Sequence, residues 1–178
     1  MLVLSGGDKE PVAQQGPDDG QPTQQATAIP GLTPTDVKLN LEQQWCLEFT
    51  GPRQIAHLCL DQGTAVDPDT GISLICDICE NTVGLDVARV VFTVDAASLA
   101  QCTQVSADLV TSLASRYLGY CATLPYDGAE PQAAKEWVEA HVSEATGVEL
   151  TTTIGGVIFR LYGTDLVKVL EIAPDEGS

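Results

Sequence analysis

The chain has 178 residues, which is enough for one domain or for one domain with a tail. Its 25 acidic residues outnumber its 8 basic ones and give a formal net charge of -17, which argues against binding to nucleic acid or to anionic lipid headgroups. Hydrophobic residues make up 44% of the sequence and aromatic residues only 5%, so a core must consist mostly of Val, Leu, Ile and Ala. No apolar run approaches the ~20 residues that cross a bilayer.

The first 32 residues differ in composition from all that follow. From Asp8 to Pro30 the sequence is rich in Gln, Pro, Gly and Asp and offers almost nothing to bury. Such a segment cannot offset the entropy of ordering. We therefore predict a flexible polar tether over residues 1–32, a single domain over residues 33–173 and a short tail over residues 174–178.

The chain begins with Met1-Leu2-Val3-Leu4-Ser5-Gly6-Gly7. This run resembles the end of a bacterial lipoprotein signal peptide, in which Leu-Ser-Gly precedes a lipidated cysteine. Gly7 stands in the place of that cysteine, and the charged and apolar regions of a signal peptide do not precede the run. The resemblance implies a bacterial extracytoplasmic protein, secreted or attached to the cell envelope, with lipid or signal-peptide anchoring upstream of Met1. The alternatives are a lost lipid site or an ordinary N-terminus.

A helix-start signal opens the domain. Thr33 suits the N-cap, Pro34 the first helical position and Asp36 the first turn. These residues predict a helix that ends near Gln44, although the alternation over residues 37–41 would also suit a strand. The apolar face of this helix would carry Val37, Leu41 and Trp45.

Alternating apolar residues predict four strands after this helix. They lie at Cys46–Thr50, Gln54–Leu60, Ile72–Cys79 and Asp86–Asp95. Gly51-Pro52 marks a turn between the first two strands, and residues 61–71 read as a polar loop.

Two helices and three strands complete the predicted domain. The helices are expected at Ser98–Leu118 and Gln132–Ala145, and the strands at Val148–Ile154, Val157–Tyr162 and Leu166–Ile172. Gly155-Gly156 is a two-residue hairpin signal between the first two of these strands. The order α-ββββ-αα-βββ predicts an α+β fold, in which an antiparallel sheet of about seven strands carries three helices on one face.

Six cysteines in an acidic chain with a polar leader favour disulfides and an oxidising compartment. The alternative is a reduced cytosolic protein that uses its cysteines as small hydrophobic residues. Strand alternation places Cys46 opposite Cys59 across a hairpin, within disulfide reach. It also turns Cys76 toward the helices, where Cys102 lies on an apolar face, and this leaves Cys79 for Cys121. The predicted pairs are therefore Cys46–Cys59, Cys76–Cys102 and Cys79–Cys121.

Candidate catalytic and metal-binding residues are few. Either histidine, His57 or His141, could serve as a general base, but neither lies in a recognisable arrangement. In Cys76-Asp77-Ile78-Cys79 the neighbouring acids would raise a thiol pKa, which argues against redox catalysis.

The sequence contains two possible metal-binding patterns. Zinc could use Cys46, Cys59, Cys76 and Cys79, but the gap between the first two is longer than in a zinc knuckle. The run Asp67–Gly71 resembles the start of a calcium loop without its later carboxylates, which favours a solvated turn. We therefore expect no metal, no cofactor and no catalytic residues.

These observations predict an extracytoplasmic, disulfide-stabilised binding module on a flexible tether, which is not an enzyme. Its partner would be a small molecule, an envelope polymer or another protein. The first alternative is an acidic inhibitor or immunity-type protein that blocks a basic enzyme cleft, because anionic surfaces steer association with cationic partners. The second is a small hydrolase, which would need His57 or His141 beside an acid and a nucleophile. One concentrated acidic patch would favour the inhibitor, and an even spread of acids the binding module.

Overall fold

The computed structural model describes residues 28–51, 61–82 and 86–176. Within them it has the predicted α+β fold and the predicted order α-ββββ-αα-βββ, with one added 3₁₀ turn. The elements are α1 (Pro34–Trp45), β1 (Glu48–Thr50), β2 (Asp61–Val66), β3 (Ser73–Thr82), β4 (Asp86–Asp95), η1 (Leu99–Gln101), α2 (Ala107–Cys121), α3 (Pro131–His141), β5 (Leu150–Ile154), β6 (Val157–Gly163) and β7 (Val167–Pro174).

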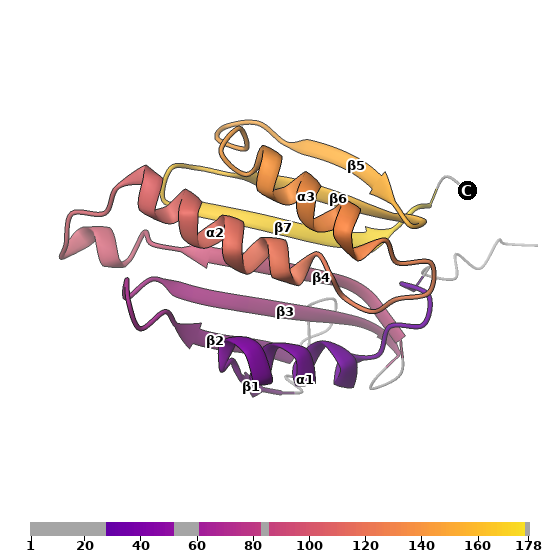
Figure 1. Ribbon diagram of the computed structural model, residues 1–178. Helices are drawn as coiled ribbons and strands as arrows, with labels where there is room; N and C mark the ends of the chain where they lie inside the picture. The colour runs from indigo at the N-terminus through magenta and orange to yellow at the C-terminus, as the bar shows by residue number, and fades with distance from the viewer. Residues whose placement is uncertain (1–27, 52–60, 83–85, 177–178) are drawn as a thin grey trace, which may run out of the picture.

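The seven strands form one antiparallel sheet in the order β1-β2-β3-β4-β7-β6-β5. All three α-helices lie on one face of this sheet: α1 lies over the β1–β2 edge, and α2 and α3 lie together on the side of β4, β7, β6 and β5 (Figure 1). We call this the helix face, and the opposite one the open face. The core lies between the sheet and the helices.

Strand alternation explains which side chains enter the core. Every second residue from Leu74 to Ile78 of β3 and from Val90 to Val94 of β4 is fully buried under the helices, and the residues between them are half-buried on the open face. The same alternation continues in β6 and β7. The buried strand positions include Leu74, Cys76, Ile78, Val90, Phe92, Val94, Val157, Phe159, Leu161, Leu170 and Ile172.

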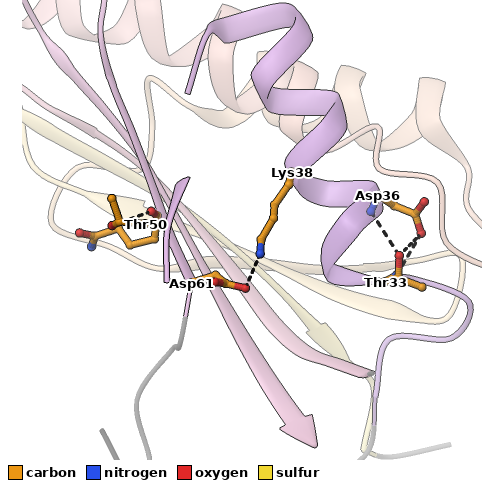
Figure 2. Close-up of polar contacts among 6 residues, drawn as sticks. Thr33, Asp36, Lys38, Thr50 and Asp61 are labelled. Carbon is orange, nitrogen blue, oxygen red and sulfur yellow. Dashed lines mark hydrogen bonds and ion pairs between the residues drawn. The ribbon is translucent and has the colours of Figure 1, made fainter. Parts of the chain in front are cut away.

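Helix α1 begins where the sequence predicts. The Thr33 hydroxyl accepts a hydrogen bond from the backbone N–H of Asp36, and the Asp36 carboxylate accepts one from the backbone N–H of Thr33, which together form a capping box. From the next turn, Lys38 reaches down to the buried carboxylate of Asp61 on β2, at 2.7 Å (Figure 2). The cap and this ion pair fix α1 over the β1–β2 edge of the sheet.

The β1–β2 region differs from the prediction. β2 covers Asp61–Val66, which reads as a polar loop in the sequence, and it pairs with β1 through Phe49 opposite Gly63. An added Cβ at Gly63 would lie 2.6 Å from the Phe49 ring, so the ring occupies the space of a side chain. The strand predicted at residues 54–60 lies outside the described residues.

Helix α2 starts later than predicted. Ser106 is its N-cap, with its hydroxyl accepting from the N–H of Leu109, and the preceding residues form only the short 3₁₀ turn η1. The N-cap at Ser106 therefore divides the predicted helix Ser98–Leu118 into two pieces. Helix α3 ends at His141, four residues before its predicted end.

The predicted boundary between tether and domain also moves. Ile29 and Leu32 are buried in the core, and the backbone N–H of Ile29 donates to the carbonyl of Val87. The segment before α1 therefore belongs to the domain. At the other end, β7 extends to Pro174, one residue into the predicted tail.

Candidate functional site

A cluster of aromatic rings lies between α1 and α2. The Trp45 ring at the end of α1 meets Tyr117 edge-on, with ring centroids 5.2 Å apart, and lies 6.4 Å from Tyr120. Tyr117 is fully buried and also meets Phe92 of β4 at 6.4 Å. In a chain with so few aromatic residues, this is a marked concentration of rings at one place.

The cluster is held by hydrogen bonds as well as by ring contacts. The Tyr117 hydroxyl donates to the carbonyl of Ile75 on β3 at 3.0 Å, and the Tyr120 hydroxyl approaches Asn40 of α1 at 3.4 Å. Burial raises the pKa of both tyrosines, so both hydroxyls stay protonated and remain donors at neutral pH. Trp45 and Tyr120 are only half-buried, and their rings border open space.

The larger of two pockets beside Trp45 lies toward the β2–β3 hairpin and has a volume of about 880 Å³. Its apolar lining residues are Trp45, Ala65, Val66, Pro68 and Ile75. Glu48 and Asp67 contribute the carboxylates of its described lining, and the Asp67 carboxylate already accepts hydrogen bonds from Thr70.

The smaller pocket, of about 450 Å³, lies toward α2 and α3. It shares Trp45 and Gln44 with the larger pocket, so these two side chains separate the two spaces. Its other lining residues are Arg116, Tyr120, Thr123, Lys135 and Glu139. We refer to the two pockets together as the Trp45 groove. Volumes of this size are typical of small-molecule sites, which combine apolar walls with a few polar groups.

Cys46 lines the larger pocket and has an unusual backbone. It is the C-cap of α1 and has φ 54°, the only positive φ at a non-glycine position among the described residues. Its N–H donates to the carbonyl of Leu41, which closes the last turn of the helix. Because this left-handed conformation favours glycine, Cys46 destabilises the cap.

The predicted disulfide pairs are wrong. Cys46, Cys76, Cys102 and Cys121 are all free thiols in the structure, and every predicted pair contains at least one of them. Cys46 caps a helix instead of sitting in a hairpin strand, and its predicted partner Cys59 lies outside the described residues. Cys102 follows the 3₁₀ turn and is exposed, so it does not lie over Cys76.

Cys76 and Cys79 lie on opposite faces of β3. Cys76 is buried on the helix face, as its alternation predicts, whereas Cys79 lines a hollow on the open face. Cys79 therefore cannot reach Cys121, which is buried on the helix face at the end of α2. Cys79 is disulfide-bonded, and none of the four free cysteines is its partner.

The same geometry bears on thiol and metal chemistry. Because they lie on opposite faces, Cys76 and Cys79 cannot share one zinc ion or form a redox pair with each other. Burial raises the pKa of Cys76 and of Cys121 well above the usual value, so neither is a thiolate at neutral pH. No group of three or more metal-ligating side chains occurs among residues 28–51, 61–82 and 86–176.

The remaining candidates have local structural partners. His141 stacks on Trp137 with ring centroids 5.3 Å apart, and its Nδ1 lies 2.7 Å from the Trp137 carbonyl. Asp67 accepts hydrogen bonds from the N–H and hydroxyl of Thr70 and so closes the turn between β2 and β3. His57 lies outside the described residues.

A second hollow, of about 360 Å³, lies on the open face. Arg89 and Arg160 line it, and both face the carboxylate of Glu171, at 3.9 Å and 2.6 Å. This carboxylate partly neutralises the two arginines. The hollow is thus less open to a charged ligand than the Trp45 groove.

No family model, curated protein or solved structure matches this chain. The longest described helix, α2, has 15 residues, fewer than the ~20 that a bilayer requires, so none of the described helices could span a membrane.

The sequence predicts one part of the groove, Trp45 on the apolar face of the first helix. Tyr120 and Arg116, which come from α2, are not among the predicted site residues. The available signal was the scarcity of aromatic residues, because a half-buried Trp facing two tyrosines stands out in such a composition.

Proposed function

We propose that this protein is an extracytoplasmic, non-enzymatic binding module of bacterial origin that holds a small ligand in the Trp45 groove. The observation that carries the proposal is a half-buried tryptophan with a pocket on each side. Half-exposed aromatic rings in a preformed hollow supply contact area at low entropic cost. The extracytoplasmic location rests on the lipoprotein-like start and the polar leader of the sequence.

The distribution of acidic residues favours this proposal over an inhibitor that blocks a basic cleft. Exposed acids occur on α1 and β1, on the β2–β3 turn, at the starts of β4 and α2, on α3 and in the loops before and after it, and at the β6–β7 turn, so they are not confined to one element. Such a spread keeps a protein soluble and does not mark one docking face. The exposed acids are Glu42, Glu48, Asp69, Asp86, Asp108, Asp127, Glu130, Glu136, Glu139, Glu144, Glu149, Asp165 and Glu176.

Tryptophan fluorescence tests the proposal directly. The chain has two tryptophans, and Trp137 lies on α3 outside the lining of the groove. In a Trp137→Phe variant all tryptophan emission comes from Trp45. We expect octyl glucoside, used below its micelle concentration as a neutral amphipathic probe, to shift and saturate this emission.

The matched control is the Trp45→Phe variant, in which Trp137 is the only emitter. Its emission should not change over the same titration. A linear, non-saturating response of Trp45, or an equal response of both tryptophans, would contradict the proposal, because either result indicates nonspecific contact.

A further inference from the structure

The charges of the Trp45 groove are uneven. Arg116 is the one exposed basic residue of the described part of the chain without an ion pair: Lys38, Arg89, Lys135 and Arg160 each have an acidic partner, and Lys168 is buried. This is unexpected in a chain with 25 acids and 8 bases. The unpaired guanidinium borders the pocket that Trp45 and Tyr120 line.

Lys135 adds a second positive charge to the same pocket. Its ammonium lies 3.6 Å from Glu139, and the two side chains are 46% and 41% exposed. Exposed pairs of this kind are weak, so Lys135 is free to turn toward a ligand. Among its described lining residues the smaller pocket therefore has two cations and one acid, and Arg116 is the cation without an ion pair.

The larger pocket has the opposite character. Its lining includes the apolar residues Trp45, Ala65, Val66 and Ile75, and none of the lining residues within the described part of the chain is basic. A ligand that covers both sides of Trp45 would meet an apolar surface on one side and positive charge on the other. The arrangement is complementary to a molecule with an apolar body and an anionic head.

We infer that the Trp45 groove selects amphipathic anions: an apolar body lies against Trp45 and the β2–β3 side, and a carboxylate or phosphate head pairs with Arg116. This inference rests on the proposed function and specifies its ligand class. Arg116 supplies the charge recognition, because a guanidinium forms two parallel hydrogen bonds with a carboxylate or phosphate. Lys135 strengthens the local positive potential.

The test compares two probes with the same eight-carbon chain and different heads, octanoate and octyl glucoside. Both are titrated against the Trp137→Phe protein below their micelle concentrations, with Trp45 emission as the readout. We expect octanoate to bind about 10-fold more tightly than octyl glucoside, which corresponds to one charge-assisted contact. Raising the salt concentration to about 0.5 M should weaken octanoate binding and leave octyl glucoside binding unchanged.

Arginine variants made in the Trp137→Phe protein test whether Arg116 causes the preference for octanoate. Arg116→Gln should weaken octanoate binding about 5- to 10-fold and leave octyl glucoside binding within two-fold, and Arg116→Lys should retain part of the octanoate affinity. The matched control is Arg89→Gln, which removes the same charge from the open face of the sheet and should change neither affinity. Circular dichroism spectra check that each variant is folded.

Three results would overturn the inference. Equal binding of both probes, or an Arg116→Gln variant with full octanoate affinity, would refute selection of anions while leaving ligand binding in the groove intact. An equal loss in Arg116→Gln and Arg89→Gln would show that only the overall charge matters. If neither probe changes Trp45 emission, the proposed function itself fails.

Discussion

Two neighbouring helix pairs on the same face of the sheet differ in how closely they approach. Helices α2 and α3 pack directly together, and Gly119 of α2 leaves room for Glu139, since an added Cβ would lie 3.3 Å from its Cγ. Between α1 and α2 lie the rings of Trp45 and Tyr120, with their centroids 6.4 Å apart. Gly119 allows a close approach at the first interface, whereas large, half-buried rings border pockets at the second.

The largest expected effect concerns Tyr117, the buried ring that packs against Trp45. Replacing the fully buried Tyr117 with Ala should lower the free energy of unfolding by about 3–5 kcal/mol, because it removes ring contacts to Trp45 and Phe92 and leaves a cavity. Tyr120→Ala, at a half-buried position, should cost only about 1 kcal/mol. Urea denaturation measures both free energies of unfolding. Equal losses would show that Tyr120 contributes as much to the core as Tyr117.

A smaller effect concerns Lys168, a buried residue of β7 that links the sheet to the segment after α3. Lys168 is 1% exposed, and its ammonium donates to the carbonyl of Ala145, at 3.1 Å, and to the Thr146 hydroxyl. Lys168→Met should lower the free energy of unfolding by about 1–3 kcal/mol, because these acceptors lose their donor. The control Lys135→Met, at an exposed position of α3, should change it by less than about 0.5 kcal/mol.

Lys168 should also make the stability of the folded protein depend on pH. Burial lowers the pKa of Lys168 in the folded protein. The folded protein therefore releases this proton before the unfolded chain does, whose lysines titrate near pH ~10.4. Between the two pKa values, the stability of the parent protein relative to Lys168→Met should rise with pH. A difference that falls with pH over this range would show that the buried amine favours its charged form.

The smallest effect lies at the end of α1. Cys46→Gly should raise the free energy of unfolding by about 1 kcal/mol, because glycine adopts φ 54° without the steric cost of a Cβ. Cys46→Ala keeps that cost and should change the stability little. A loss in both variants, seen in thermal melts, would show instead that the thiol stabilises the pocket wall.

Much of the fold could be predicted because it is encoded locally. The capping residues Thr33 and Asp36 and the hairpin glycines Gly155 and Gly156, with φ 60° and 81°, each define a turn or a helix start by themselves. β2 could not be predicted in the same way. Its interior position at Gly63 is filled by the Phe49 ring, and Asp61 is buried only because Lys38 pairs with it.

The cysteines and the groove show the limit of reasoning from alternation. Strand alternation correctly predicts that Cys76 faces the helices. It does not predict which cysteine of the helical region lies near Cys76, because that depends on where α2 begins. In the same way, Trp45 was placed on a helix face, but its neighbours Arg116 and Tyr120 come from a helix about 70 residues later in the chain. Neighbours across a helix interface depend on tertiary packing.

The central claim is that a ligand binds beside Trp45, and the indole N–H resonances of the two tryptophans test it most directly. In a two-dimensional proton–nitrogen NMR spectrum each tryptophan gives one indole signal, and the Trp137→Phe variant assigns them. On addition of octanoate we expect the Trp45 signal to shift and saturate while the Trp137 signal stays in place. A shift of the Trp137 signal alone, or no shift of either signal, would contradict the account.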